Sequence, residues 1–287
     1  ETITWSSPST PPQSRPGSFW RASSIGAVTD MMEGTPLGKG GLQTNGDPTL
    51  FQVVDRKTGA VRTFENPGFI HAHILNSWEE GDDIWIDLTW YDANNKTTLG
   101  WMNRWFLEYM KDPTTREQWP RSKVMRYRLK ADGSVETQVL FADEDGENDF
   151  EVPKINEKLN GHPYCMVYAT QFHSYEYDVD QQATKGGPFG AVGLAKRNLC
   201  TGERRGRYVP NTYPSEVQFV ADPGGINEDD GVLLGIVFDG NTNSSSFHIL
   251  DARTLELVAK AELPVKMPFL IHASYFPEEI APIHITI

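Results

Sequence analysis

The stretch PGFIHAHILNSWEEGDDIWIDL, residues 67–88, decides the fold. Two apolar runs, FIHAHIL and DIWIDL, flank the acidic segment EEGDD, in which a glycine favours a tight turn. Strand-sized runs joined by such a turn predict a β-hairpin. His71 and His73 lie two residues apart, so on a strand their side chains would share a face. They are either a metal-binding pair or ordinary strand residues.

The same texture repeats along the chain. Residues 49–65 and 124–142 each read as two short apolar runs around a turn, and similar runs continue to about residue 263. This pattern predicts an all-β sandwich, barrel or propeller, and successive four-stranded units favour a β-propeller. Residues 100–118 alone have helix-like spacing, which Pro113 ends, so we expect a short helical insertion there.

Composition limits the classes of partner. The 287 residues carry a formal net charge of −13, with a pI of about 5.0, which argues against a protein that binds nucleic acid. No apolar stretch reaches the roughly 20 residues of a membrane span. Residues 1–47 are rich in Ser, Pro and Gly, so we expect an irregular arm or linker there, with the propeller over 48–287.

The two cysteines, Cys165 and Cys200, are far apart in the sequence. Their spacing matches no zinc-binding or redox motif. We also expect no disulfide framework in a chain of this size. The sequence therefore assigns the cysteines no role.

Three segments contain sequence motifs that are more specific than the strand pattern. Residues 49–88 contain His73-Ile-Leu-Asn76 followed by Trp78 and two glutamates, and DFEVPKIN begins at Asp149. Residues 211–277 contain, in order, Pro-Ser-Glu, Glu-Asp-Asp-Gly, Leu-Asp-Ala-Arg, Leu-Pro and Pro-x-x-x-His. Together these motifs resemble the carotenoid cleavage oxygenases, the family of carotene oxygenases, retinoid isomerases and stilbene-cleaving enzymes. The resemblance covers about the C-terminal half of a family member.

This resemblance implies a seven-bladed propeller with Fe(II) on its axis. In the family, four histidines hold the iron and three glutamates orient three of the imidazoles. Carried over residue by residue, His73 and His272 match two iron ligands, and Glu151 and Glu216 match two of the glutamates. The other two ligands have no counterpart in this chain, which is expected to supply half of the iron site.

The last motif departs from the family pattern. The usual aromatic-His-Gly is replaced by Ile271-His272-Ala273. Because glycine adopts backbone angles that alanine avoids, the sequence predicts an altered geometry around His272.

Other candidate residues have plainer interpretations. We expect His71 to pack or to support the site, and the acidic stretches Glu228-Asp229-Asp230 and 143–147 to be solvated turns or loops. The aromatic residues of the segment 100–118 either line an apolar tunnel or pack a helix against the propeller. These are Trp101, Trp105, Phe106 and Tyr109.

Two functions from different classes follow from the resemblance. In the first, the chain is part of an iron dioxygenase that uses O2 to cleave a conjugated double bond in a carotenoid or apocarotenoid. In the second, it is a degenerate, inactive homologue that serves as a structural or pigment-contacting subunit of a complex. Half a propeller exposes apolar blade faces and strand edges. Either way, we expect a complementary N-terminal half or a protein partner to cover the open face. The compartment is not predicted.

Overall fold

The computed structural model describes residues 2–5, 48–92, 121–140, 149–177, 183–186, 191–267, 269 and 272–276. Over these residues the chain is all-β, as predicted, apart from a short 3₁₀ helix at Glu157–Leu159. The predicted helix at 100–118, the acidic loop 143–147 and most of the 1–47 arm lie outside the described residues. The division at residue 47 stays a prediction.

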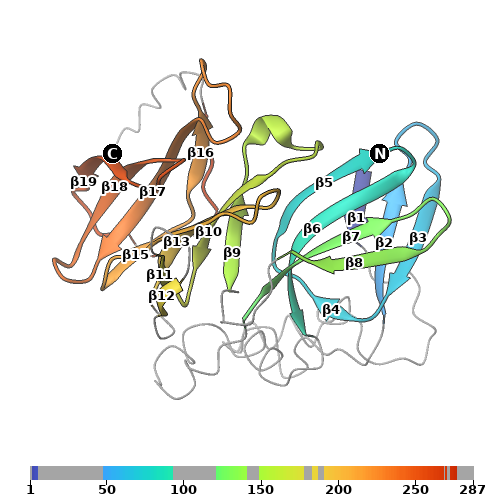
Figure 1. Cartoon of the computed structure of the whole chain (residues 1–287), viewed down its shortest axis with the longest axis horizontal. Helices are drawn as coiled ribbons and strands as arrows, with labels where there is room; N and C mark the ends of the chain where they lie inside the picture. Colours follow the sequence, from blue (N-terminus) through green and yellow to red (C-terminus); the bar gives the residue numbers. More distant parts are fainter. Residues whose placement is uncertain are drawn as a thin grey trace, which may run out of the picture. The chain divides into compact units, whose positions relative to one another are not determined.

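The described chain forms two compact units, one ending at Glu151 and the other beginning at Val152. The first unit contains two antiparallel sheets (Figure 1). One has the order β1-β2-β3 (Thr2–Trp5, Thr49–Val54, Val61–Asn66). The other has the order β4-β6-β7-β8, with β5 also paired to β6 (Phe69–Ile70, Ile74–Glu80, Asp83–Asp92, Lys123–Leu129, Val135–Val139).

The hairpin predicted within residues 67–88 is confirmed as β5 and β6. Glu80 pairs with Asp83, so the loop has two residues, and its first residue, Gly81, has a φ of 64°. A positive φ at the first loop position is the geometry of a tight hairpin turn and is natural for glycine. A register shift between Ile74 and Asn76 marks a β-bulge next to His73.

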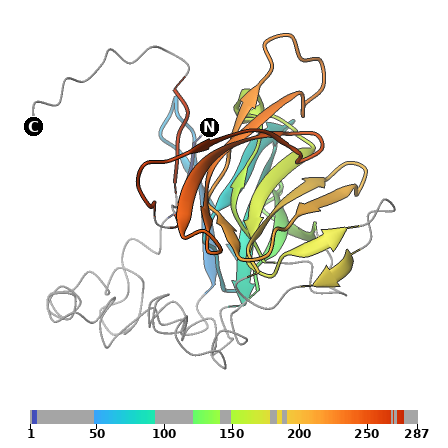
Figure 2. The same ribbon diagram turned by 90° about the vertical axis from the view of Figure 1, so that its left-hand side faces the viewer.

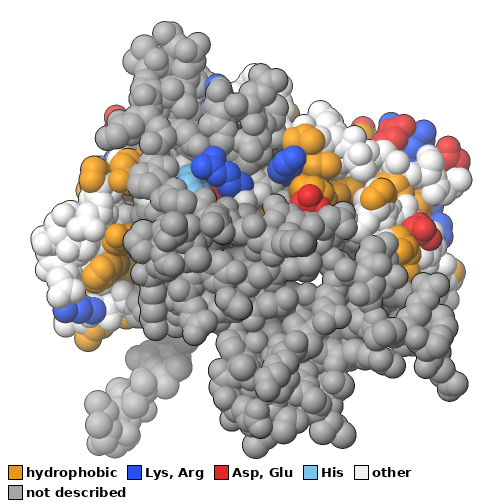
Figure 3. All heavy atoms as spheres, turned by 90° about the horizontal axis from the view of Figure 1, so that it is seen from below, with side chains coloured by type: hydrophobic (Ala, Val, Ile, Leu, Met, Phe, Trp, Pro, Cys, Tyr) orange, Lys and Arg blue, Asp and Glu red, His pale blue; other side chains and the backbone are white. Residues whose placement is uncertain are grey.

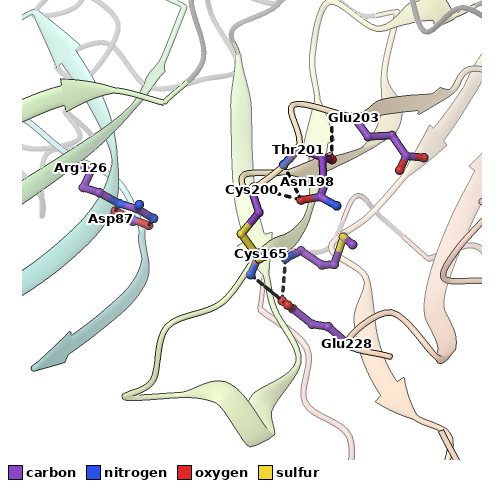
Figure 4. Close-up of a disulfide and its surroundings, with 9 residues drawn as sticks. Asp87, Arg126, Cys165, Asn198, Cys200, Thr201, Glu203 and Glu228 are labelled. Atoms are coloured by element: carbon purple, nitrogen blue, oxygen red, sulfur yellow. Dashed lines mark hydrogen bonds and ion pairs between the residues drawn. A yellow bond between two sulfur atoms is a disulfide. The ribbon is translucent and has the colours of Figure 1, made fainter. Parts of the chain in front are cut away.

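A polar and aromatic cluster fastens this hairpin to β7. Trp78 and Trp85 stack across the strands with ring centroids 5.9 Å apart, and the Arg126 guanidinium lies 4.9 Å from the Trp78 ring. Arg126 also donates two hydrogen bonds to the fully buried Asp87 carboxylate, at 2.8 and 2.7 Å (Figure 4). A bidentate pair of this kind compensates the buried charge and fixes the strand register.

The core of the first unit lies between its two sheets. Side chains from β2 and β3 meet side chains from β6 and β7, and all of them are almost completely buried. They include Phe51, Phe64, Ile86, Leu88, Tyr127 and Leu129. At about 25 cal/mol per Å² of apolar surface, this shared burial is the main force that holds the two sheets together.

The second unit contains three antiparallel sheets. One has the order β14-β13-β10-β9 (Arg204–Arg207, Gly193–Asn198, Met166–Gln171, Phe150–Lys154), with β9 beginning in the first unit. A two-stranded sheet pairs β11 with β12 (Tyr175–Tyr177, Ala183–Gly186). The last has the order β15-β17-β18-β19, with β16 also on β17 (Thr212–Pro214, Gly231–Asp239, Ser244–Asp251, Leu257–Glu262, Gln218–Ala221). Figure 2 shows the strong twist of this last sheet, coloured orange to red.

The core of the second unit is again a layer between two sheets. Tyr168 and Leu194 project from β10 and β13, and Phe219, Leu233 and Leu250 project from the last sheet. Tyr168 and Phe219 stack with ring centroids 5.6 Å apart. Both units therefore follow one plan, in which consecutive antiparallel sheets pack face to face.

The stretch Glu228-Asp229-Asp230 is not the solvated turn that the sequence predicted. The Glu228 carboxylate accepts hydrogen bonds from the backbone N–H groups of Cys165 and Met166, and burial raises its pKa. Asp229 is buried against Lys196, and Asp230 bonds the backbone of its own loop. Two of the three acidic side chains therefore fasten β10 and β13 to the loop before β17.

Cys165 and Cys200 form a disulfide, which corrects the expectation from the sequence. The cysteines are 35 residues apart, but antiparallel pairing of β10 with β13 brings Cys165, just before β10, next to the turn after β13. In that turn the Asn198 side-chain oxygen accepts hydrogen bonds from the backbone N–H groups of Cys200 and Thr201 (Figure 4). The disulfide and Glu228 therefore hold Cys165 from two directions.

Some large apolar side chains remain exposed on the described strands. All six residues of β19 are exposed, with Val258 at 62%, and so are Val61 on β3 and Val139 on β8. Figure 3 shows orange hydrophobic side chains among charged ones on one face of the molecule. No helix in the described part of the chain is both long and apolar enough to cross a membrane.

Candidate metal centre

His73 lies in the connection between β4 and β5 and not within a strand. The expectation that His71 and His73 share a strand face is therefore wrong, because that rule applies only to extended pairing strands. The His73 side chain is 25% exposed.

Thr89 on β6 fixes the backbone of His73. The Thr89 hydroxyl accepts the His73 N–H at 2.9 Å, and the Thr89 N–H donates to the His73 carbonyl oxygen at 2.8 Å. Thr89 is completely buried. Since hydrogen bonds hold both polar groups of the His73 backbone, the direction in which the imidazole leaves the chain is set by β6.

The imidazole of His73 meets the buried carboxylate of Glu151. His73 Nδ1 lies 2.6 Å from Glu151 Oε2, and Glu151 is 5% exposed. An imidazole that donates its Nδ1–H to a carboxylate carries its lone pair on Nε2, the atom that binds a metal in such pairs. The structure thus brings together two residues that are 78 positions apart.

Tyr91 completes this group from β6. Its hydroxyl donates to Glu151 Oε1, so the two carboxylate oxygens have different partners, one phenol and one imidazole. Burial first, and then the negative charge of Glu151, raise the pKa of Tyr91 well above its usual value. The phenol therefore remains a proton donor at every physiological pH, and it orients the carboxylate toward His73.

The chain leaves ordinary backbone geometry on both sides of Glu151. Asp149 has a φ of 89° and Val152 a φ of 46°, which is a strained conformation for a β-branched residue. His272 also has a positive φ, 69°. Such strain is uncommon outside sites where the surrounding structure imposes it. Of the six positive-φ residues other than glycine in the described ranges, two thus lie within two positions of Glu151 and a third is His272.

Glu216 is buried in the connection between β15 and β16. Its Oε2 accepts the backbone N–H of Ala273 at 2.6 Å, and its Oε1 lies 2.8 Å from Lys154 Nζ. His272 Nδ1 is 3.9 Å from the same Oε1, beyond hydrogen-bonding distance, and the His272 side chain is 70% exposed. Glu216 therefore holds the backbone beside His272 but not its imidazole.

The geometry around His272 answers the question raised by Ala273. The left-handed residue is His272 itself, and Ala273 has no positive φ. Alanine therefore needs no conformation reserved for glycine here, and the unusual geometry belongs to the histidine.

His71 lies close enough to His73 and Glu151 to interact electrostatically with both side chains. Burial lowers the pKa of His71 below its usual value. His71 is consequently neutral at neutral pH. That His71 packs or supports the site stays a prediction.

Sequence reasoning missed Thr89, Tyr91 and Lys154. Thr89 and Tyr91 lie two residues apart on β6, so the strand pattern places them on one face. Nothing in that pattern shows that Thr89 binds the His73 backbone or that Tyr91 binds Glu151. Lys154 follows Glu151 in the matched motif and contacts a different glutamate. Tertiary contacts alone define these three roles.

The first unit contains the pair His73 and Glu151, and the second unit contains Glu216 and His272. Within the described ranges, no three His, Cys, Asp or Glu side chains form a group that could hold a metal ion. The residues present nevertheless fit a metal in one respect. The His73–Glu151 pair is the donor arrangement that a metal-binding imidazole requires.

Known proteins resemble this chain over most of its length. It is 25% identical over 239 residues to the chloroplastic carotenoid cleavage dioxygenase 8 of Arabidopsis thaliana, with 81% of this chain and 40% of the relative covered. It is 28% identical to the carotenoid 9,10(9',10')-cleavage dioxygenase of Crocus sativus, with 76% and 38% covered. The human mitochondrial carotenoid-cleaving dioxygenase is 27% identical, with 80% and 43% covered. The chain thus spans about two fifths of the length of these relatives.

A solved structure agrees on the fold. The cobalt-substituted apocarotenoid oxygenase of Synechocystis superposes with a TM-score of 0.63 at 23% identity, covering 79% of this chain and 44% of the other. The fold is accordingly part of a seven-bladed β-propeller. Residues 34–277 match the family described as retinal pigment epithelial membrane protein. With this match over most of its length, the chain belongs to the carotenoid oxygenase family.

Proposed function

We propose that this chain supplies part of the active centre of an Fe(II)-dependent dioxygenase that cleaves a conjugated double bond of a carotenoid or apocarotenoid with O2. The observation that carries the proposal is the pair of hydrogen bonds to the Glu151 carboxylate, one from the Tyr91 hydroxyl and one from His73 Nδ1, which lies 2.6 Å from Oε2. A carboxylate on the outer ring nitrogen is the usual partner of a metal-binding imidazole, which supports a ligand role for His73. The relatives named as carotenoid-cleaving dioxygenases supply the substrate class.

In this proposal His73 and His272 are iron ligands, and Glu151 and Glu216 orient them. Iron, when bound, activates O2 next to the substrate double bond. The chain's own residues perform the positioning. Thr89 holds the His73 backbone, Tyr91 holds Glu151, and Glu151 keeps the Nδ1 proton of His73 in place, so that Nε2 presents its lone pair.

Two further histidines and one glutamate complete the proposed site from a complementary N-terminal half, in the same or another chain. The apolar polyene is the proposed partner on the substrate side. Exposed apolar residues on strands such as β19 support burial against further protein, because unpaired apolar edges promote aggregation.

The test is metal content together with cleavage, measured in protein that contains the complementary half. We expect about one iron per propeller and O2-dependent conversion of an apocarotenoid into two carbonyl products. His73→Ala should abolish both. His162→Ala, which alters an exposed histidine, is the matched control and should change neither. Unchanged cleavage by His73→Ala shows that His73 is not a ligand.

A second candidate function is a non-catalytic subunit that contacts pigment or stabilises a complex. The specific observation in its favour is His272, which is 70% exposed and is 3.9 Å from the glutamate assigned to it. Iron-free, inactive protein that still assembles with the complementary half would select this function over the first.

A further inference from the structure

The two glutamates of the candidate site hold their carboxylates in different ways. Glu151 has a neutral phenol on one oxygen and the His73 imidazole on the other. Glu216 has a lysine ammonium on Oε1 and a backbone N–H on Oε2. The position that the imidazole takes at Glu151 is thus taken by Lys154 at Glu216.

Lys154 and His272 face the same oxygen atom. Lys154 Nζ is 2.8 Å from Glu216 Oε1, while His272 Nδ1 is 3.9 Å from it. Lys154 is 25% exposed at the side chain and Glu216 only 3%, so this ion pair is largely shielded from water. A charge-assisted bond of this kind outcompetes a neutral imidazole donor for the oxygen.

From this geometry we infer that Lys154 is a positioning residue that competes with His272 for Glu216 and thereby sets how strongly His272 can bind a metal. The significance for metal binding rests on the proposed function, since His272 is taken as a ligand. The competition itself rests only on the contacts of Lys154, Glu216 and His272.

Removing the Lys154 ammonium should let the His272 imidazole form a hydrogen bond with the Glu216 carboxylate. In Lys154→Met, Glu216 Oε1 loses its donor, and an unsatisfied buried oxygen is unfavourable by about 1–3 kcal/mol. His272 Nδ1 already lies 3.9 Å from this oxygen, so a movement of about 1 Å would bring it within hydrogen-bonding distance. The resulting pair would have the arrangement of His73 with Glu151.

The first experiment uses the metal-free chain labelled with ¹⁵N at histidine. NMR at a pH where imidazoles are neutral reports the tautomer of each ring. We expect Lys154→Met to shift His272 toward the Nδ1–H tautomer, and Lys154→Arg, which keeps the cation, to leave the wild-type spectrum. Lys158→Met, at an exposed lysine four residues on, is the matched control.

The double variant Lys154→Met/Glu216→Gln should return the His272 signal toward wild type, because the glutamine is a much weaker acceptor. A folded Lys154→Met chain with an unchanged His272 tautomer overturns the inference. If that variant does not fold, Lys154→Gln, which keeps a polar side chain, is measured in its place and judged by the same criterion.

The second experiment measures Co²⁺ affinity in protein that contains the complementary half. Partners of metal ligands typically change affinity by 10- to 100-fold, so Lys154→Met should bind roughly tenfold more tightly than wild type. A tautomer shift without metal binding in any variant contradicts the proposed function and leaves the competition intact. Metal binding by wild type with no effect of Lys154→Met on tautomer or affinity contradicts the competition alone.

Discussion

Lys196 Nζ lies 2.6 Å from the carboxylate of Asp229, and the two side chains are only 4% and 10% exposed. Lys196 also donates to the carbonyl oxygen of Arg253 at 3.1 Å. This pair joins β13 to the loop before β17, next to the layer of apolar side chains between the two sheets. A buried ion pair of this kind adds little net stability to the folded state, because both charges must leave water. Removing one partner is nevertheless strongly destabilising, because the other charge stays buried without it.

The first prediction follows from that asymmetry. Lys196→Met should lower the free energy of unfolding by about 3–5 kcal/mol, because the buried Asp229 loses its close cation and keeps only the half-exposed Arg253, whose Nε lies 3.9 Å from Oδ1. The double variant Lys196→Met/Asp229→Leu should recover most of this loss. Urea denaturation provides the measurement. Lys260→Met, which removes an exposed pair with Glu262 on β19, is the control and should cost less than about 1 kcal/mol.

The second prediction concerns the Cys165–Cys200 disulfide. Opening it should lower the free energy of unfolding by about 2–4 kcal/mol, since the bond restricts a loop of 35 residues in the unfolded chain. Urea denaturation with and without dithiothreitol measures the effect. The variant Cys165→Ala/Cys200→Ala should show no response to dithiothreitol. Equal stability of oxidised and reduced wild-type protein would refute the structural role.

The third prediction tests the hydroxyl that orients Glu151. Tyr91→Phe leaves a buried carboxylate oxygen without its phenol and should lower metal affinity about tenfold in protein with the complementary half. Co²⁺ titration measures it. Tyr127→Phe is the matched control, because Tyr127 is equally buried on the adjacent strand but packs in the apolar core. Equal effects of the two substitutions would reduce Tyr91 to a packing residue.

The fourth prediction concerns pH. Burial lowers the pKa of His71 from 6.5, so below about pH 6.5 the unfolded chain binds a proton that the folded chain does not. This part of the stability is present above pH 6.5 and is lost as the pH falls through the folded pKa. In His71→Gln the loss of stability between pH 7.5 and pH 5.5 should be smaller. Urea midpoints at the two pH values decide it, and identical losses in both proteins would contradict the assignment.

The sequence predicted the strands well and the contacts between sheets poorly. The hairpins at 49–65 and 67–88 were visible because apolar alternation and turn residues are local signals. The match to family motifs also selected His73 and Glu151, whose contact no periodicity reports.

The contacts that could not be predicted from the sequence are those that depend on which strands become neighbours in the fold. Glu228 and Asp229 look like a solvated acidic turn until β10 and β13 are placed beside them. Cys165 and Cys200 look unrelated until the same two strands pair. His71 and His73 were misplaced for the opposite reason, because a strand rule was applied to a connection between strands.

The Cys165–Cys200 cross-link also governs how the protein should be produced. A bacterial cytoplasm keeps thiols reduced, whereas the periplasm and the secretory pathway allow sulfur–sulfur bonds to form. Material made in a reducing host would leave the segment around Cys165 without its covalent link to the turn after β13, although Glu228 would still bind its backbone. Expression host is therefore a variable to control before any failure to assemble or to bind iron is attributed to the chain itself.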